Sequence, residues 1–167
     1  VLATALKLGF PVAELLTGLA TFRGTGRRFE LKGTVHGVRV IDDYGHHPTE
    51  IHVTLEAARR FADAGRLIVI FQPHRYSRTK AFASEFAQEL NKADRAILLE
   101  VYAASEKPID GVSSRLITSM MNKGEYIPNF VEATDSVIAD AQPGDVIMTL
   151  GAGDVSSLAP IIVEGLS

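Results

Sequence analysis

The stretch that decides the fold is RLIVIF, residues 66–71, which leads directly into QPHRYSRT, residues 72–79. A continuous apolar run of this length is typical of a strand that is buried on both faces of a sheet. Beyond the polar segment, Phe82, Phe86 and Leu90 recur every fourth residue, which predicts a helix over residues 77–93. The chain therefore passes from a buried strand, through a polar turn, into an amphipathic helix.

The same alternation of strand and helix covers most of the chain. Further strands are expected at residues 38–41, 96–101, 126–131 and 146–150, and further helices at 48–61, 112–121, 136–141 and 155–164. Apolar strands between amphipathic helices predict a parallel sheet with helices on both faces, and right-handed crossovers make such a sheet doubly wound. We therefore expect an α/β fold with a doubly wound, mostly parallel, Rossmann-like sheet.

The N-terminal segment differs from this alternation. Residues 1–8 and 12–20 predict two short helices that break at Gly9-Phe10-Pro11, because proline disfavours helix at and just before its own position. The chain opens inside an apolar, helix-prone segment with no capping residue ahead of it. We therefore expect a piece of a longer protein, in which residues 1–23 are the remnant of a preceding domain and residues 24–167 form a second domain.

A basic linker and a hairpin are expected to join these two parts. Residues 23–28 are rich in glycine and arginine, which indicates either an exposed linker or an arginine that reaches a phosphate bound in the preceding domain. Residues 29–35 and 38–44 predict a β-hairpin that turns at His36-Gly37. His36 is expected to serve the turn alone.

Composition excludes several classes of function. The chain has 167 residues with 46% apolar and 22% charged side chains, which is ordinary for a globular domain with a single core. A net charge of −3 provides no general basic field for nucleic acid, so the arginines must act locally. The absence of cysteine excludes disulfides, thiolate metal sites and a cysteine nucleophile. No apolar run spans a membrane and no signal peptide is recognisable, so we expect a cytoplasmic protein.

The segment DDYGHHPTE, residues 42–50, is the richest in chemistry. Pro48 suits the first helical position and Glu50 the first turn, so a helix start explains part of it. It leaves two aspartates, Tyr44 and two histidines unexplained. We interpret these as a carboxylate that binds a ribose or an amine, and a histidine that donates or accepts a proton. A metal site of Asp43 with a histidine lacks a third ligand.

The segment PHRYSRT, residues 73–79, carries the second group of polar side chains. Arg75 and Arg78 lie at the start of an expected helix, and such an arginine pair is either a solvated turn or a pocket for a carboxylate or phosphate. Both segments follow strands, as do residues 102–108 and 151–154. Ligands of doubly wound sheets bind beyond the carboxyl ends of the strands, so we expect these turns to converge at one edge.

Other polar or unusual segments have simpler interpretations. Gly151-Ala152-Gly153-Asp154 lacks the third glycine of a dinucleotide motif, so we expect a tight turn in which Asp154 caps the last helix. Met120 and Met121 are expected in the core, and His52 on a helix surface. Residues 102–108 are an ordinary loop or a further contact to substrate.

Taken together, these segments resemble the C-terminal domain of the Mur ligases. The resemblance is carried, in the family's order and over nearly the whole chain, by GTGRRFE at residues 24–30, DDYGHHPTE at 42–50, FQPHRYSRT at 71–79, EVYAASEKPI at 100–109 and GAGD at 151–154. It is strongest to the family member that adds L-alanine to UDP-N-acetylmuramate in bacterial peptidoglycan synthesis.

The resemblance implies an ATP- and Mg²⁺-dependent ligase that forms an acyl phosphate, which the amine of L-alanine attacks with release of ADP. It assigns Arg28 to the nucleotide phosphates and Asp43 to ATP, and it places His46, Arg75 and Arg78 around the alanine and the reacting carboxyl group. Tyr44 and His74 are further candidates for substrate binding. The family's phosphate-binding loop and its magnesium ligands belong to a central domain that these residues do not include, so we expect the chain to be inactive without its own N-terminal and central domains.

Two alternatives remain open. One is the related ligase that attaches a recovered murein tripeptide to UDP-N-acetylmuramate, although the full HRYSR segment favours the alanine enzyme. The other is a Rossmann-like module that binds a nucleotide without catalysis. Such a module needs a glycine-rich phosphate loop after its first strand, where this chain has Tyr44-Gly45-His46-His47.

Overall fold

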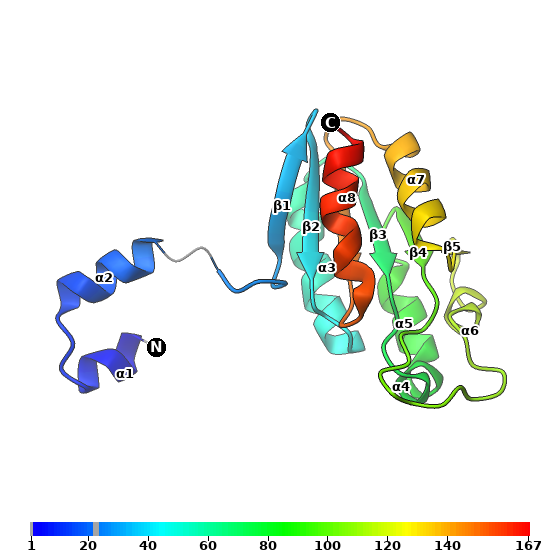
Figure 1. Ribbon diagram of the computed structural model, residues 1–167, viewed down its shortest axis with the longest axis horizontal. Helices are drawn as coiled ribbons and strands as arrows, with labels where there is room; N and C mark the ends of the chain where they lie inside the picture. Colours follow the sequence, from blue (N-terminus) through cyan, green and yellow to red (C-terminus); the bar gives the residue numbers. More distant parts are fainter. Residues whose placement is uncertain (1, 22–23) are drawn as a thin grey trace.

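The computed structural model describes residues 2–21 and 24–167. This part of the chain forms a six-stranded sheet with the strand order β1-β2-β6-β3-β4-β5. The strands are β1 (Glu30–Val35), β2 (Val38–Asp43), β3 (Leu67–Phe71), β4 (Arg95–Leu98), β5 (Gly124–Tyr126) and β6 (Val146–Leu150). β1 and β2 form the expected antiparallel hairpin, and every other neighbouring pair is parallel (Figure 1).

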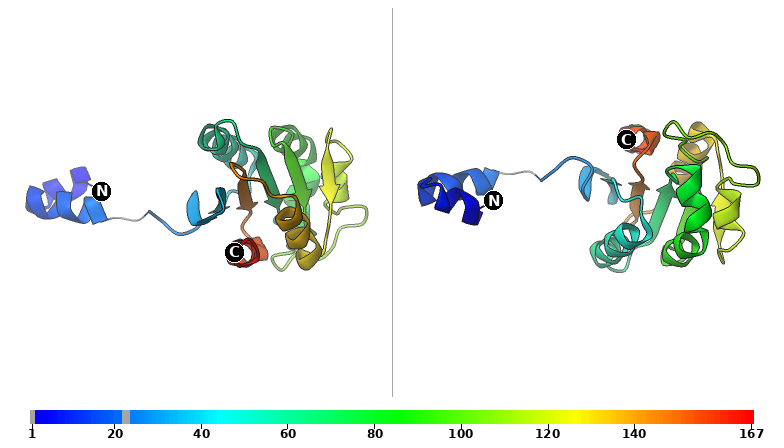
Figure 2. Two further views of the ribbon diagram at one scale, coloured as in Figure 1. Left: turned by 90° about the horizontal axis from the view of Figure 1, so that it is seen from above. Right: turned by 90° about the horizontal axis from the view of Figure 1, so that it is seen from below.

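Helices cover both faces of the sheet. They are α3 (Pro48–Ala62), α4 (Tyr76–Ala81), α5 (Ala83–Leu90), α6 (Arg115–Thr118), α7 (Phe130–Asp140), the 3-10 helix η1 (Asp154–Ser157) and α8 (Leu158–Gly165). Figure 2 shows α3 and α5 on one side of the sheet and α7 and α8 on the other. The predicted α/β, doubly wound and mostly parallel fold is confirmed.

Two apolar clusters explain why the sheet is covered twice. Side chains of a strand alternate between its faces, so Val69 and Phe71 of β3 pack with α3 and α5, whereas Ile68 and Ile70 pack with α7 and α8. All of these side chains are fully buried. Burial of such a side chain stabilises the fold by ~1.5–3 kcal/mol, so this strand is the centre of the core.

The helix expected over residues 77–93 is two helices. Phe82, with φ −123° and ψ 23°, interrupts the α conformation between α4 and α5. The interruption places the Phe82 ring 5.0 Å from the ring of His47. The predicted burial of Phe86 and Leu90 is confirmed, so the four-residue spacing identified the buried face but not the break.

Two further boundaries differ from the sequence prediction. The helix expected over residues 112–121 contains only one α-helical turn, α6, because the amides of Met120 and Met121 that follow it bond carbonyls three residues earlier, as in 3-10 turns. α7 begins six residues before the expected start, where the strand of residues 126–131 was expected to end. Asn129 caps α7 by accepting the amides of Val131 and Glu132.

The N-terminal helices α1 (Leu2–Lys7) and α2 (Val12–Thr21) match the two expected ones. Neither contains a buried residue, and Figure 1 shows them apart from the sheet. Several large apolar side chains on them are exposed, including Leu6 at 43% and Leu16 at 55%. Val1, Phe22 and Arg23 lie outside the described residues. Among the described residues, no helix is long and apolar enough to cross a membrane.

The strands place four turns at one edge of the sheet. Asp43 of β2, Leu150 of β6, Phe71 of β3 and Leu98 of β4 are paired at the same level. The segments that follow these strand ends carry most of the polar residues that the sequence singled out. The predicted convergence at the carboxyl edge therefore follows directly from the register of the parallel strands.

Candidate functional site

The loop between β2 and α3 is held in place by its own polar side chains. The carboxylate of Asp43 accepts hydrogen bonds from the amides of Phe29 and Gly45, both at 2.8 Å, and from the hydroxyl of Thr54 at 3.2 Å. Glu50 accepts the amides of His46 and His47 at 3.0 and 3.1 Å. The backbone beside Tyr44 and His46 is therefore fixed before any ligand arrives.

Capping explains more of this segment than the sequence indicated. His47 is the N-cap of α3, where its ring nitrogen Nδ1 accepts the amide of Thr49 and Glu50 completes a capping box. Burial acts to raise the pKa of Glu50, but the amides of His46 and His47 and the nearby His46 ring lower it overall. Three residues of the motif, Asp43, His47 and Glu50, thus build the loop, and Tyr44 and His46 are left for chemistry.

The loop between β3 and α4 is bound to the segment that follows β4. The amide of Arg75 donates to the carbonyl of Tyr102, and the amide of Tyr102 donates to the carbonyl of Pro73, both at 2.8 Å. The ring of His74 stacks on that of Tyr102, with centroids 5.5 Å apart. These contacts fix the backbone that carries the two arginines, and they hold the His74 ring beside that of His46 in the loop after β2.

The two loops meet through a row of rings. The ring of Tyr44 lies 5.2 Å from that of His46, which lies 5.5 Å from that of His74. At the other end of the row, the guanidinium of Arg28 lies 5.3 Å from the centre of the Tyr44 ring. The structure therefore brings together the residues that the sequence placed at one site.

The cations of this site lack protein counter-ions. Within the described residues, Arg28, Arg75 and Arg78 take part in no ion pair. Nη1 of Arg78 and Nδ1 of His74 are buried and have no hydrogen-bond partner there. Buried polar atoms are almost always hydrogen-bonded, so these two need an acceptor or donor from outside this fold. An anion such as a carboxylate or phosphate meets this need at Arg78.

The charges around His74 favour its neutral form. Burial lowers the pKa of His74, and the positive charges of His46, Arg78 and Arg75 lower it further. At neutral pH, one ring nitrogen of His74 can therefore accept a hydrogen bond or a proton. The arrangement can hold an anion with arginines while a neutral imidazole faces an adjacent amine.

Comparison with known proteins is consistent with this geometry. A family model described as "Mur ligase, glutamate ligase domain" matches residues 27–153, which is most of the chain. The chain belongs to the Mur ligase family. Curated relatives named UDP-N-acetylmuramate–L-alanine ligase are 51% identical over 169 residues in Mycobacterium ulcerans (strain Agy99) and 50% identical over 173 residues in Mycobacterium tuberculosis (strain H37Rv). Each match covers 99% of this chain and 35% of the relative, so the chain spans about a third of their length.

Solved structures agree with the Mur ligase assignment. The UDP-N-acetylmuramate–alanine ligase of Thermotoga maritima superposes with a TM-score of 0.77 at 29% identity, covering 98% of this chain and 35% of the other. A murein peptide ligase of Psychrobacter arcticus gives a TM-score of 0.72 at 23% identity, covering 99% and 35%, and shows the shared fold alone. The alternative of a Rossmann-like module that binds a nucleotide without catalysis finds no support in these comparisons, because the relatives they name are ligases.

One residue of this Mur ligase domain was underrated by the sequence. Arg27, interpreted as part of an exposed linker, donates to the carbonyls of Gly151 at 2.6 Å and Gly153 at 3.2 Å, and it lies 3.4 Å from Asp42. Asp42 is fully buried; burial raises its pKa, while a hydrogen bond from Thr149 at 2.7 Å opposes the rise. Arg27 and Gly151 are far apart in the sequence, so no local pattern indicates the contact between them.

Other expectations for the Mur ligase domain need correction. Gly153, not Asp154, is the N-cap residue of η1, and no side chain caps that helix. Met120 is 49% exposed and lies outside the core, whereas Met121 packs against it. The expected surface position of His52 and the turn position of His36 are confirmed. The described residues contain no group of three or more side chains suited to a metal ion.

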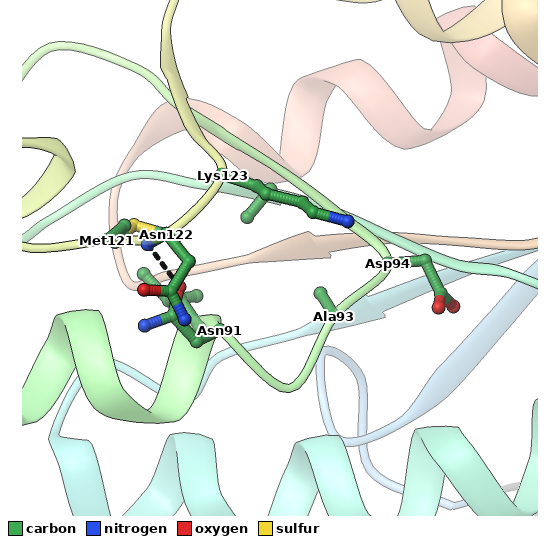
Figure 3. Close-up of a pocket in the computed structure, with 8 residues that line it drawn as sticks. Asn91, Ala93, Asp94, Met121, Asn122 and Lys123 are labelled. Carbon is green, nitrogen blue, oxygen red and sulfur yellow. Dashed lines mark hydrogen bonds between the residues drawn. The ribbon is translucent and has the colours of Figure 1, made fainter.

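A cavity of about 180 Å³ lies at the opposite edge of the Mur ligase sheet, between the end of α5 and the start of β5. Figure 3 shows Asn91, Asp94 and Lys123 around it, with the amide of Asn122 bonded to Asn91. Asp94 is already bound to Arg59 and to the amide of Leu67. None of the residues that the sequence predicted for the site lines this cavity, so the carboxyl edge remains the candidate.

Proposed function

We propose that this chain is the amino-acid-binding domain of an ADP-forming ligase that joins L-alanine to the carboxyl group of UDP-N-acetylmuramate. One observation carries the proposal: His46, His74, Arg75 and Arg78 converge at the carboxyl edge, and Arg75 and Arg78 form no ion pair with a carboxylate in the described residues. The names of the relatives that are about 50% identical indicate the substrates. By the same reasoning we place the reaction in the bacterial cytoplasm, in peptidoglycan precursor synthesis.

In the proposed reaction, Arg75 and Arg78 bind the carboxylate of L-alanine and offset negative charge that develops when its amine attacks the activated carboxyl group. His46 orients the amino acid beside them. A neutral His74 faces the amine and accepts its hydrogen bond. The contacts of Asp43, Glu50 and Tyr102 hold these groups in place, so little ordering is required when the substrate binds.

ATP is the proposed co-substrate and supplies the phosphate that activates the muramoyl carboxylate as an acyl phosphate. Arg28 is exposed and free of carboxylate partners in the described residues, which suits contact with nucleotide phosphates. Asp43 was expected to contact ATP, but its oxygens already accept three hydrogen bonds. We therefore propose that Asp43 acts on the nucleotide through the backbone of its loop. Mg²⁺ would be held mainly by another domain, because the described residues lack a suitable ligand cluster.

The rest of the active site is proposed to come from the enzyme's own N-terminal and central domains. The exposed apolar side chains of α1 and α2, including Leu6 and Leu16, fit residues 1–23 as part of a neighbouring domain. A chain that spans 35% of its relatives also leaves room for the proposed nucleotide-binding domain. We expect the 167-residue chain alone to have no ligase activity.

The alternative is the ligase for a murein tripeptide. The Psychrobacter arcticus murein peptide ligase is 23% identical, against 51% for the Mycobacterium ulcerans alanine ligase, which favours the alanine enzyme. The test is release of ADP by the full-length enzyme with UDP-N-acetylmuramate and either L-alanine or the tripeptide as the amine. Stimulation by the tripeptide alone would refute the proposal, as would turnover by the isolated chain.

A further inference from the structure

The backbone of the arginine-bearing loop is strained at Arg75. Its φ of 75° and ψ of 135° lie close to a region that only glycine adopts readily, so this conformation is unfavourable for an arginine. Such a conformation persists only where surrounding contacts enforce it. Two contacts with the segment after β4 do so here: the amide of Arg75 bonds the carbonyl of Tyr102, and the amide of Tyr102 bonds the carbonyl of Pro73.

Glu106 adds a third contact between the same two segments. One carboxylate oxygen accepts the amide of Ser77 at 2.9 Å, and the other accepts the Ser77 hydroxyl at 2.6 Å. The pKa of Glu106 is lowered, first by the hydroxyl and then by the amide of Ser77. Arg75, the N-cap residue of α4, makes no capping hydrogen bond of its own. A side chain from a distant loop thus does the work of a local cap.

The loop that carries Glu106 is itself tightly turned. The amide of Glu106 bonds the carbonyl of Ala103, and both Ala104 and Ser105 have positive φ, at 47° and 70°. The side chain of Glu106 is therefore directed back onto α4 by a constrained backbone. It also occupies the start of this short helix, so a substrate anion is left to the arginine side chains.

We propose that residues 102–106 are a clamp that fixes the position of Arg75 and Arg78, and that Glu106 is its key positioning residue. Ser77 lies between the two arginines, so holding Ser77 sets both the strained turn before it and the first turn of α4 after it. This inference rests on the proposed function, in which these arginines bind the carboxylate of the amino acid. Glu106 touches neither substrate nor nucleotide in this scheme.

The test uses the full-length enzyme with Glu106→Ala and Glu106→Gln. A displacement of ~1 Å in a binding group can lower enzyme activity ~100-fold. Because the two backbone hydrogen bonds between the segments remain in Glu106→Ala, we expect a smaller effect, a rise of about tenfold in the KM for L-alanine. The KM for ATP should stay within about twofold, since the clamp does not act on Arg28. Glu106→Gln retains an acceptor for Ser77 and should show a smaller rise.

The matched control is Glu85→Gln. Glu85 is another glutamate that accepts a serine hydroxyl, that of Ser84 at 2.8 Å, but it is exposed and lies on α5 away from the arginine loop. Its kinetic constants should equal those of the unchanged enzyme. An unchanged KM for L-alanine in Glu106→Ala, or an equal rise in the KM for ATP, would overturn the clamp. If the unchanged enzyme uses a different amine, the proposed function fails, and the same variants test the clamp with that amine.

Discussion

The arginines that begin β4 and precede β3 are paired with carboxylates, whereas Arg75 and Arg78 after β3 are not; Arg27, also at the carboxyl edge, lies 3.4 Å from Asp42. At the amino edge, Arg66 pairs with Asp140 and Asp145, and Arg95 pairs with Glu125 and Asp140. At the carboxyl edge, Arg75 and Arg78 have no carboxylate partner among the described residues, and Nη1 of Arg78 is buried without a hydrogen bond. Paired arginines stabilise a fold, whereas unpaired ones that the backbone holds together are suited to a ligand. The difference locates the site better than concavity does, since the cavity described above lies at the amino edge.

The largest effect on activity is expected at the carboxyl edge, where Arg75 and Arg78 are unpaired. Arg78→Ala in the full-length enzyme should lower kcat/KM for L-alanine by roughly 10–150-fold, because a hydrogen bond to a charged group contributes ~1.5–3 kcal/mol. The free energy of unfolding should change by less than about 0.5 kcal/mol, because no protein partner is lost. Steady-state kinetics and urea unfolding measure the two quantities. A loss of stability with unchanged kinetics would show that Arg78 is structural.

Substitution at the amino edge, where the arginines are paired with carboxylates, should give the reverse result: stability is lost and activity is kept. Arg66→Ala leaves the carboxylate of Asp145, whose side chain is 4% exposed, without its partner at 2.7 Å. Breaking a fully buried pair costs 3–5 kcal/mol, and because Arg66 is 35% exposed we expect about 2 kcal/mol. Urea unfolding of the chain measures this loss, and kcat/KM of the full-length enzyme should stay within about twofold. A comparable loss of activity would contradict the division between the edges.

The pH dependence of stability sharpens the same contrast. Burial acts to raise the pKa of Asp145, but the hydrogen bond from Arg66, the amide of Gln142 and the charge of Arg66 lower it overall. A lowered pKa in the folded state stabilises the fold above the ordinary aspartate pKa of 3.8, and this contribution is lost as pH falls through the lowered value. Asp145→Asn should therefore flatten the acid limb of the stability curve below about pH 4. If thermal unfolding at pH 2–6 showed an unchanged acid limb in this variant, the ion pair of Asp145 and Arg66 would not contribute to stability as proposed.

His74 offers a spectroscopic test of the unpaired edge. Burial and the charges of His46, Arg78 and Arg75 lower its pKa below the usual 6.5. Replacing Arg78 with methionine removes one of these charges and should raise the pKa of His74 toward that value, while burial keeps it below. NMR titration of the histidine ring protons measures the change. The expected shift is small, and no shift would mean that Arg78 does not face His74.

The smallest effect on stability is expected for Glu125, an exposed carboxylate that pairs with an arginine at the amino edge. Glu125→Gln removes the partner of Arg95 at 2.8 Å, but the side chain of Glu125 is 42% exposed. Exposed ion pairs contribute about 0–1 kcal/mol, so the free energy of unfolding should fall by at most that amount. Urea unfolding at low and high salt checks it, because screening should remove the difference. A salt-independent loss would show that the hydrogen-bond geometry, not the charge, matters.

Local sequence signals were sufficient to predict the bounds of an element wherever its residues favour a single type of secondary structure. The strand at residues 146–150 was predicted residue for residue, because its apolar run is bounded by Asp145 and Gly151. The start of α7 was missed because Phe130 and Val131 favour a strand by composition, and the capping role of Asn129 was not recognised. Asparagine followed three residues later by glutamate was the signal that could have placed it.

For the functional site, too, some features could be predicted from the local sequence and others could not. That the polar segments after β2 and β3 share an edge follows from the parallel strand pattern, and the sequence predicted it. The clamp on Ser77 and the contact of Arg27 with Gly151 join residues 29 and 124 positions apart, so no local pattern contains them. Glu50 differs, because it bonds amides only three and four residues away; its capping of its own loop leaves fewer residues for chemistry than the motif indicated.

By itself, the sequence determined the α/β class, the order of the strands along the chain, and the segments that carry histidine and arginine. It could do so because apolar periodicity and the position of each polar turn are local properties. The tertiary structure alone decided which arginines are neutralised and which are left free. That outcome depends on which distant carboxylates the fold brings within reach, as it does for Arg66 and does not for Arg78.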